Sequence, residues 1–311
     1  MQETAEVLVS VAITAYNHER FIAAALESVL SQKTDFKFEI IVGDDGSDDR
    51  TTEIVSSFQQ RFPQSIRVVR PPENEGLFKN VMHILNVCRG EYIALMDGDD
   101  RWTSDDKLQQ QVGFLRNNEA YAGCFHDARI VLTDAEDRKT SSYSESYRSY
   151  SQFNHYRPDF FAWDLLERVV IPTSSLVFRK GNLEKELLNY EMISASLDWV
   201  AQLMMIKDSK FRYFNETWSV YNNNKGGMTK KVATSAFIDN NILVLRKLLN
   251  DDYYQNLRHH VHEALAVEMV NKFFLDDPSI SKPDRIALVL RYFLHTQKQL
   301  FYRTANLLEQ L

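Results

Sequence analysis

An α/β fold with a mostly parallel sheet is predicted from the alternation of strand-like and helix-like segments in the first hundred residues. Each apolar, β-branched segment of strand length is followed by a polar loop and then by a stretch with apolar residues at helical spacing. This alternation is typical of a Rossmann-like, doubly wound sheet flanked by helices. From about residue 233 onward the pattern is helical, which predicts a C-terminal helical extension.

The first two strand–helix pairs carry the clearest signals. A strand is expected at 7–13, and a helix at 20–32, where apolar residues recur every three or four positions. A second strand is expected at 38–42. The acidic and Ser-containing loop at 44–49 has residues that cap helices, so a second helix should follow at 51–62.

A third strand is expected at 66–69, a third helix at 77–88 and a fourth strand at 92–96. The second half of the chain departs from this rhythm. Residues 134–158 are rich in Ser, Tyr and charged groups without periodicity, which predicts an unusually long surface loop. Beyond this loop we expect a strand at 174–178, a helix near 198–203 and helices from 233 to the end.

Composition narrows the classes of function. The hydrophobic share of 44% and the charged share of 25% are ordinary for a globular protein, and the net charge of -7 argues against non-specific nucleic-acid binding. Cys88 and Cys124 lie outside metal-binding spacings, so a reducing cytosol fits best. Residues 1–6 lack signal-peptide features and no apolar run has the length of a membrane span. We therefore expect a cytoplasmic protein that meets a membrane only from its inner surface.

Three carboxylates follow the apolar run at 92–96. Asp97, Asp99 and Asp100 would stand where a buried strand opens into a loop. Carboxylates crowded at one strand end repel each other and resist desolvation, so they need a counter-charge, most simply a divalent cation. The alternative reading of this motif is a solvated acidic turn.

Two further polar loops should reach the same edge of the sheet, where ligands bind in open α/β folds. The first offers Thr14, Tyr16 and Asn17, and the second offers Asp44 and Asp45. An aromatic platform, a carboxylate that can accept a base N–H, and an acidic cluster together suit a nucleoside diphosphate. A metal would bridge its phosphates to the carboxylates.

The chain resembles an inverting glycosyltransferase of family two, with the glycosyltransferase A fold. The matching stretches are residues 9–17, 39–49, 74–76 and 90–100, and Ser196–Trp199, which is similar to the family's Glu-Asp-Trp motif. The resemblance covers about the first 230 residues. It implies a catalytic domain at 1–230, with a nucleotide-binding half at 1–125 and an acceptor-binding half at 126–230, and it leaves 231–311 as the helical extension.

The resemblance also implies roles for the loop residues. Thr14, Tyr16 and Asp45 would hold the nucleoside, with Asp45 accepting from the base, and Asp44 would support its loop. Asp99 would be the main ligand of Mn²⁺ or Mg²⁺, while Asp97 and Asp100 would serve the metal, its waters, the ribose or the loop geometry. The implied nucleotide-binding set is Thr14, Tyr16, Asn17, Asp44, Asp45, Asn74, Gly76, Lys79, Asp97 and Gly98. For Lys79, a helix-surface position is an equal alternative to a phosphate contact.

Asp198 is the catalytic residue that the resemblance implies. In an inverting transfer the acceptor hydroxyl attacks opposite the leaving diphosphate, so a base must take its proton. The alternative is an Asp at a helix amino terminus ahead of a core Trp. His18, His126 and His155 have no partner at catalytic spacing in the sequence, which predicts ordinary surface or core roles.

Two later segments are less specific. Asn222 and Asn224 stand where many relatives have Arg and His, so Lys225 is the expected source of positive charge there. The basic and aromatic stretch at 291–303 suits packing, a homodimer contact or an anionic membrane surface.

The donor implied by the resemblance is a nucleotide sugar, most often a uridine diphosphate sugar, and the acceptor is a glycan, a lipid-linked glycan or a protein. The resemblance thus points to the synthesis of surface polysaccharides or glycoconjugates. A nucleotidyltransferase would share the sheet but would open with a Gly-rich basic loop, and the first loop has none. A nucleotide-sugar-binding module without turnover is the other alternative.

Overall fold

The computed structural model describes residues 6–133, 157–167, 171–181, 183–191, 196–224 and 234–276. The chain divides into two compact units, Met1–Lys230 and Lys231–Leu311. Most of the loop predicted at 134–158, together with His155, Lys225 and the 291–303 stretch, lies outside the described residues. The division of the first unit into nucleotide and acceptor halves stays a prediction.

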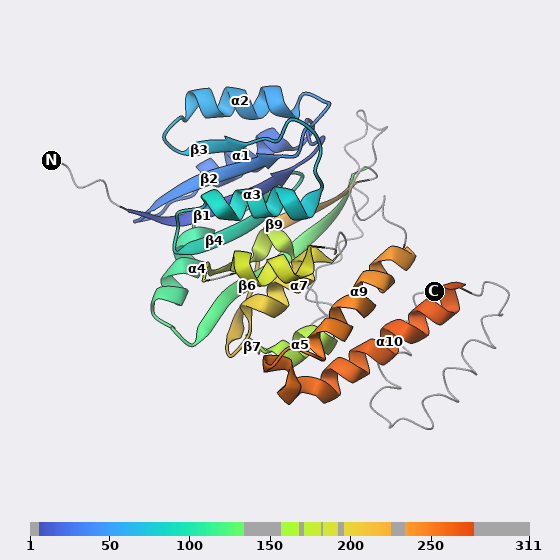
Figure 1. Ribbon diagram of the computed structural model, residues 1–311. Helices are drawn as coiled ribbons and strands as arrows, with labels where there is room; N and C mark the ends of the chain where they lie inside the picture. The colour runs from blue at the N-terminus through green and yellow to red at the C-terminus, as the bar shows by residue number, and fades with distance from the viewer. Residues whose placement is uncertain are drawn as a thin grey trace. The chain divides into compact units, whose positions relative to one another are not determined.

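The first half of the sheet is parallel and built from strand–helix repeats (Figure 1). Its strands lie in the order β3-β2-β1-β4, and neighbours are parallel. The elements are β1 (Val7–Ala15), α1 (Ile22–Leu30), β2 (Lys37–Asp44), α2 (Thr51–Arg61), β3 (Ile66–Val69), α3 (Leu77–Val87) and β4 (Tyr92–Asp97). The sequence predicted each of these elements. Three of the predicted strands are shorter than the observed ones, and the predicted helices are slightly longer.

The second half makes the sheet mixed. Beyond β4 the order continues β8-β6-β9-β5, with β8 antiparallel to both β4 and β6, β9 parallel to β6, and β5 and β7 antiparallel to β9. Its elements are β5 (Arg101–Trp102), α4 (Lys107–Arg116), β6 (Tyr121–Thr133), β7 (Asp159–Phe160), α5 (Ala162–Glu167), η2 (Thr173–Ser175), β8 (Val177–Arg179), α6 (Leu183–Leu187), η3 (Leu188–Tyr190), α7 (Leu197–Met205) and β9 (Lys210–Asn224). The α/β fold class is confirmed, with wholly parallel pairing up to β4 and mixed pairing beyond it.

The strand predicted at 174–178 begins later than expected. Residues 173–175 form a 3₁₀ turn, closed by hydrogen bonds from Ser175 N to Pro172 O (2.9 Å) and from Leu176 N to Thr173 O (3.2 Å). The strand therefore starts at Val177. Apolar composition alone does not reveal such a turn, because buried turns and buried strands use the same side chains.

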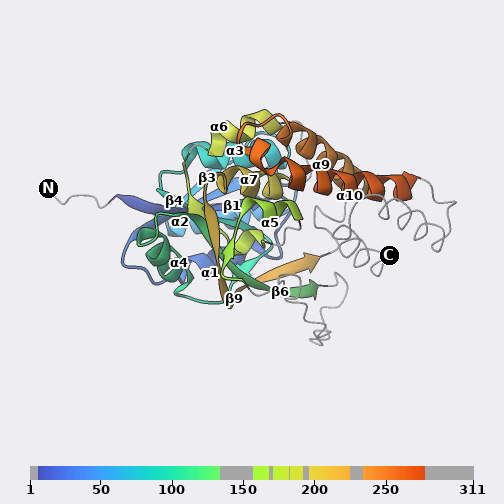
Figure 2. The ribbon, with the colours of Figure 1, turned by 90° about the horizontal axis from the view of Figure 1, so that it is seen from below.

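Helices cover both faces of the sheet, α3 on one and α1 with α4 on the other (Figure 2). Alternate residues of β1 point to opposite faces, and Val9, Val11 and Ile13 are fully buried in the core that includes α1 and α4. On the other face α3 lies very close to β2. A Cβ at Gly43 would stand 2.2 Å from Asn80 Oδ1, and the Asn80 amide donates to Gly43 O at 2.9 Å.

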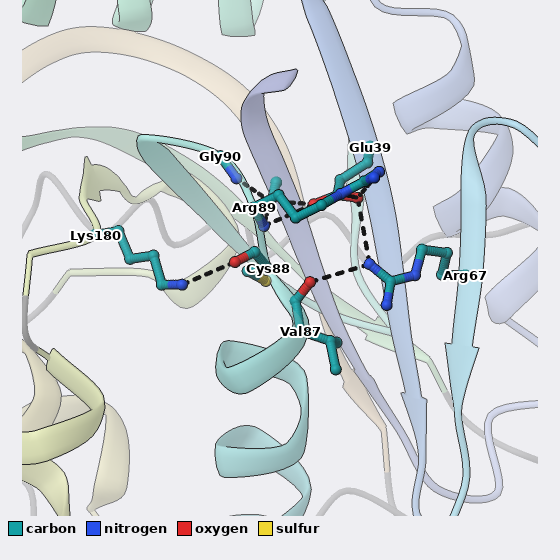
Figure 3. Close-up of polar contacts among 8 residues, drawn as sticks. Glu39, Arg67, Val87, Cys88, Arg89, Gly90 and Lys180 are labelled. Carbon is teal, nitrogen blue, oxygen red and sulfur yellow. Dashed lines mark hydrogen bonds and ion pairs between the residues drawn. The ribbon is translucent and has the colours of Figure 1, made fainter. Parts of the chain in front are cut away.

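A buried carboxylate joins the strands near their amino ends (Figure 3). Glu39 is 1% exposed and accepts hydrogen bonds from Ser10 Oγ at 2.8 Å and from Arg89 Nη2 at 2.6 Å, with Arg67 Nη1 at 3.7 Å. Burial opposes ionisation of Glu39, but the hydrogen bonds from Arg89 and Ser10 outweigh it and lower the pKa of this carboxyl. The contact links β1, β2, β3 and the turn before β4.

Two cations hold the carboxyl end of α3, Arg67 from the contact with Glu39 and Lys180. Arg67 Nη1 donates to Val87 O at 3.1 Å, and Lys180 Nζ donates to Cys88 O at 2.8 Å (Figure 3). Cations favour the carboxyl end of a helix because its last carbonyls lack partners and carry partial negative charge. These contacts fix the carboxyl end of α3.

The second unit contains a helical pair in its described part. It comprises α9 (Thr234–Leu248), η4 (Tyr253–Leu257) and α10 (Arg258–Asp276). Asn241 Nδ2 donates to Glu268 Oε1 at 2.8 Å, and Lys272 Nζ lies 2.6 Å from Asp239 Oδ1, so α9 and α10 are joined by polar contacts. Among the helices described here, none combines the length and apolarity that crossing a bilayer requires.

One lysine is fully buried in the first unit. Lys107 opens α4, and its Nζ lies 4.2 Å from the centroid of the Trp102 ring. Within the described part of the chain, this Nζ has no hydrogen-bond partner. Burial lowers the pKa of Lys107 to about 7, because the ammonium loses its hydration.

We predict that Glu39→Gln lowers the free energy of unfolding by about 2 kcal/mol, because the cations around it would lose their charged acceptor. The effect should be fully present above pH 4.5, the ordinary pKa of the group, and should be lost as the pH falls through the lowered pKa of folded Glu39. Urea unfolding at pH 7 and at pH values decreasing from 4.5 measures it. Glu53→Gln, which removes an exposed helix-surface carboxylate, is the control, and equal effects of the two variants would contradict the prediction.

The buried lysine predicts a pH dependence of the same sign, but at higher pH. The unfolded chain holds the Lys107 proton up to its ordinary pKa of 10.5, whereas the folded chain releases it near 7. Stability should therefore rise by about 1.4 kcal/mol per pH unit between about pH 7.5 and pH 10, relative to Lys107→Met, which lacks the titrating group. Urea unfolding of both proteins across this range is the measurement. Parallel pH profiles would show that Lys107 is not buried as described.

Candidate functional site

Strand register brings three loops to one edge of the sheet. Thr14 pairs with Asp97 of β4, and Ala15 pairs with Asp44 of β2, so β1, β2 and β4 end side by side. The Thr14 hydroxyl donates to Asp97 Oδ1 at 2.7 Å, and Gly98 N donates to Thr14 O at 2.7 Å. The loop after β1 and the acidic loop after β4 are thus directly bonded.

The loop after β1 presents one aromatic ring and uses its amide internally. Tyr16 is 36% exposed and stands beyond the strand end, where a flat ligand could stack on it. Asn17 adopts a left-handed conformation (φ 58°), its N donates to Ser47 Oγ at 3.0 Å, and its Oδ1 accepts from Asp48 N at 2.9 Å. Asn17 therefore ties the first loop to the second, and its contact with a nucleotide stays a prediction.

The two acids after β2 have different partners. Asp44 is fully buried and accepts from the Ser47 hydroxyl and the Thr52 hydroxyl, each at 2.5 Å, with Arg70 Nε at 3.4 Å. Asp45 accepts from Glu75 N at Oδ1 and from Gly76 N at Oδ2, both at 2.9 Å. Asp44 supports its own loop, and Asp45 ties it to the loop before α3, so a base N–H would have to share an oxygen that already accepts a bond.

The loop before α3 carries the other residues of the predicted set. Gly76 has φ 90°, a conformation that disfavours side chains, and it directly precedes the first residue of α3. Asn74 is exposed near the Asp45 contact. Lys79 is exposed on the first turn of α3, with its Nζ 3.5 Å from Glu75 Oε1. Its position fits the helix-surface alternative.

The three acids after β4 do not point the same way. Asp100 is 2% exposed, and its Oδ1 accepts from Asn222 N at 3.0 Å. Asp99 remains partly exposed, with its Oδ2 3.9 Å from His18 Nε2. Across the described ranges, no three or more His, Cys, Asp or Glu side chains are arranged as a ready set of metal ligands. The predicted trio is therefore split, with Asp100 bonded to β9 and Asp97 to Thr14.

Negative charge is crowded at this edge. Burial raises the pKa of Asp97 to about 7, and the charges of Asp99 and Asp198 add to the shift. Burial also raises the pKa of Asp100 well above its ordinary value, again with contributions from Asp99 and Asp97. Carboxylates held together in this way fit a hard divalent cation, whose charge would relieve the repulsion. Asp99 and Asp97 are the residues that would hold it.

Asp198 lies in the first turn of α7, the helix that follows the left-handed residue Ser196 (φ 65°). Its side chain is open to solvent, but the surrounding protein desolvates the carboxylate enough to raise its pKa. Its charge acts on Asp97, so the two acids are within electrostatic reach of each other although a hundred residues separate them. Trp199 Nε1 donates to Leu165 O at 2.9 Å and anchors this turn.

Two residues near the acids were not identified from the sequence. His18 was expected to have an ordinary surface or core role, and its Nε2 lies 3.9 Å from Asp99 Oδ2, a contact that the sequence did not reveal. Asn222 was noted only for its departure from relatives, yet it donates to Asp99 O and Asp100. The signal for His18 was its place directly after the first loop. By contrast, His126 is buried, and its lowered pKa fits the predicted core role.

Comparison with known proteins decides the family. The model of the family described as Glycosyl transferase family 2 matches residues 10–184, which include the loops after β1, β2 and β4. The chain belongs to this family. An uncharacterized protein of Mycobacterium bovis is 31% identical over 223 residues, which are 70% of this chain and 60% of that protein. The family-2 chain thus spans less than two thirds of this relative's length.

Two other matches carry more specific descriptions. A UDP-Glc:alpha-D-GlcNAc-diphosphoundecaprenol beta-1,3-glucosyltransferase of Escherichia coli is 33% identical over 129 residues, 40% of this family-2 chain and 49% of the relative. The structure of S. aureus TarS 1-349 in complex with UDP-GlcNAc superposes with a TM-score of 0.60 at 19% identity, covering 91% of this chain and 76% of that one. The latter likeness shows the glycosyltransferase A fold.

The charge crowding makes a testable prediction for Asp97. Replacing Asp99 by Asn removes the charge that, after burial, contributes most to raising the pKa of Asp97, so this pKa should fall below about 7. Carboxyl ¹³C NMR titration of the metal-free protein measures it. Asp106→Asn, a change at a partly exposed position before α4, should leave Asp97 unaffected. An unchanged Asp97 titration in the Asp99 variant would contradict the electrostatic coupling.

Proposed function

We propose that this family-2 chain transfers a sugar from a nucleoside diphosphate sugar to an acceptor hydroxyl, with inversion at the anomeric carbon. The observation that carries the proposal is the convergence of an exposed aromatic ring, two bonded loops and crowded acids at the carboxyl edge of β1, β2 and β4. Ligand sites of open α/β sheets lie at this edge. The arrangement supports Tyr16 and Asp45 as contacts to the nucleoside.

A divalent cation, Mn²⁺ or Mg²⁺, is the proposed cofactor. Asp99 would hold it together with Asp97, and it would neutralise charge on the leaving diphosphate. The raised pKa of Asp97 supports this, because the carboxyl is desolvated by burial and the charges of Asp99 and Asp198 act on it as well. Asp100 enters this proposal as a loop-holding residue, since its carboxylate accepts from the backbone of β9.

Asp198 is the proposed general base. A base must accept the proton of the acceptor hydroxyl as the new bond forms, and a raised pKa makes a carboxylate a better acceptor. The desolvation of Asp198 shifts its pKa in that direction. Its place in the first turn of α7, outside the acidic loop, separates the proton-accepting group from the group that would face the diphosphate.

Uridine diphosphate sugar is the proposed donor, and a lipid-linked glycan of a surface polymer is the proposed acceptor. The E. coli relative is described as acting on UDP-Glc and a diphosphoundecaprenol-linked sugar, and TarS as binding UDP-GlcNAc. These printed descriptions support the choice of classes. A glycan or protein acceptor is distinguished by offering each class to the enzyme together with labelled donor.

The central test replaces Asp198 by Asn. The variant should lose at least about a thousand-fold in kcat, as expected on removal of a general base, while its affinity for UDP with Mn²⁺ stays within about two-fold. Asp208→Asn, an exposed acid after the same helix, is the matched control. Transfer and donor hydrolysis are followed with labelled UDP-sugars, and binding by calorimetry.

Retained turnover in the Asp198 variant would remove this residue from the mechanism. Wild-type protein that binds UDP-sugar without transfer or hydrolysis would indicate a binding module. Formation of a nucleotide sugar from sugar phosphate and nucleoside triphosphate would indicate a nucleotidyltransferase.

A further inference from the structure

Asn222 of β9 makes two hydrogen bonds to the acidic loop. It is 6% exposed and lies near the end of β9. Its side-chain Nδ2 donates to Asp99 O at 2.5 Å, and its backbone N donates to Asp100 Oδ1 at 3.0 Å. One residue thus contacts the backbone of Asp99 and the carboxylate of Asp100.

These bonds extend a short antiparallel ladder. Arg101 pairs with Val220 and Trp102 pairs with Ser219, so the loop after β4 returns along β9 and reaches Asn222. Trp102 Nε1 donates to Ser174 O at 2.8 Å and fixes the end of this ladder. On its other side the loop is bonded to Thr14. The segment that carries Asp99 is therefore held between β1 and β9.

The Asn222 amide acts on the peptide of Asp99, whose side chain is partly exposed. A donor on Asp99 O limits rotation of that peptide, and the backbone direction sets where the carboxylate can reach. Without the Asn222 amide, Asp99 O would lose its hydrogen-bond donor beside the buried carboxylate of Asp100. An unpaired carbonyl in such a place is costly, so the loop would tend to rearrange. A loop that is already ordered loses less conformational freedom when a ligand binds, so its affinity for the ligand is higher.

We propose that Asn222 is a positioning residue that presents the Asp99 carboxylate to the cation and diphosphate of the donor. This inference rests on the proposed function for the identity of the ligand. The Asn222 amide touches neither donor nor acceptor. Its effect is transmitted through the Asp99 peptide, so it should appear in donor affinity more than in the chemical step.

The test compares Asn222→Asp and Asn222→Ala with Asn223→Ala, a change at the next residue of the strand. Asn222→Asp keeps the shape but replaces the donor by an acceptor, whereas every variant keeps the backbone bond to Asp100. Both Asn222 variants should raise the calorimetric Kd for UDP with MnCl₂ and the donor KM about tenfold, with kcat changed less than threefold. Asn223→Ala should leave Kd, KM and kcat within twofold of wild type.

A measurement on the unmodified full chain covers the case in which a variant fails to fold. Three backbone N–H groups of this segment have acceptors. Gly98 N donates to Thr14 O, Asp100 N donates to Asp97 O, and Thr103 N donates to Trp218 O. Hydrogen exchange of a peptide spanning 97–103 should therefore be slow before any ligand is added, and faster in each folded Asn222 variant. Exchange in the unliganded wild type at the rate of an unstructured peptide would overturn the proposal.

The outcomes separate this inference from the function it rests on. If wild type binds UDP with MnCl₂ and the folded Asn222 variants bind equally well, the positioning role is wrong while the function stands. If wild type binds no nucleoside diphosphate, the proposed function fails, and the exchange measurement alone decides whether Asn222 holds the loop.

Discussion

The hydrogen bond from Thr14 to Asp97 is the contact on which the site depends. It joins the ends of two adjacent parallel strands, and it is possible only because the register of β1 on β4 places these residues side by side. If β1 slipped by one residue along β4, the side chains of Thr14 and Asp97 would lie on opposite faces of the sheet. The bulky apolar residues of β1, which are buried between helices on both faces, fix that register.

Beyond that contact, the site brings carboxylates close together and holds them there with hydrogen bonds from the protein. Burial, followed by the nearby charge of Asp99, raises the pKa of Asp97 and of Asp100 at this edge. Protein donors hold these acids in place, Thr14 for Asp97 and Asn222 for Asp100. Asp99 keeps the exposure that a ligand of a cation needs. Near the amino ends of the strands, the contact between Glu39 and Arg89 holds the strands together and takes no part in the candidate site.

The parallel half of the sheet could be predicted because local signals suffice there. Each strand of that half is apolar and bounded by loop residues, and each helix shows a clear period. The mixed half could not be predicted in the same way. Pairing of β8 with β4 joins segments eighty residues apart, and no local pattern encodes such contacts.

The same distinction applies to the site. Convergence of the loops followed from parallel topology, so Thr14, Asp97 and Asp44 were brought together as predicted. The directions of individual side chains did not follow. Asp45 and Asn17 bond to neighbouring loops, and His18 lies beside Asp99, because these contacts depend on turn geometry that residue type alone leaves open.

The account's central claim is that the carboxyl edge of β1, β2 and β4 binds a nucleoside diphosphate through its crowded acids. Calorimetric titration of the wild-type chain with UDP, GDP and ADP, each with and without Mn²⁺, tests it most directly. The account predicts that at least one of them binds and that Mn²⁺ strengthens its binding. Absence of binding by all three, with the metal present, would contradict it.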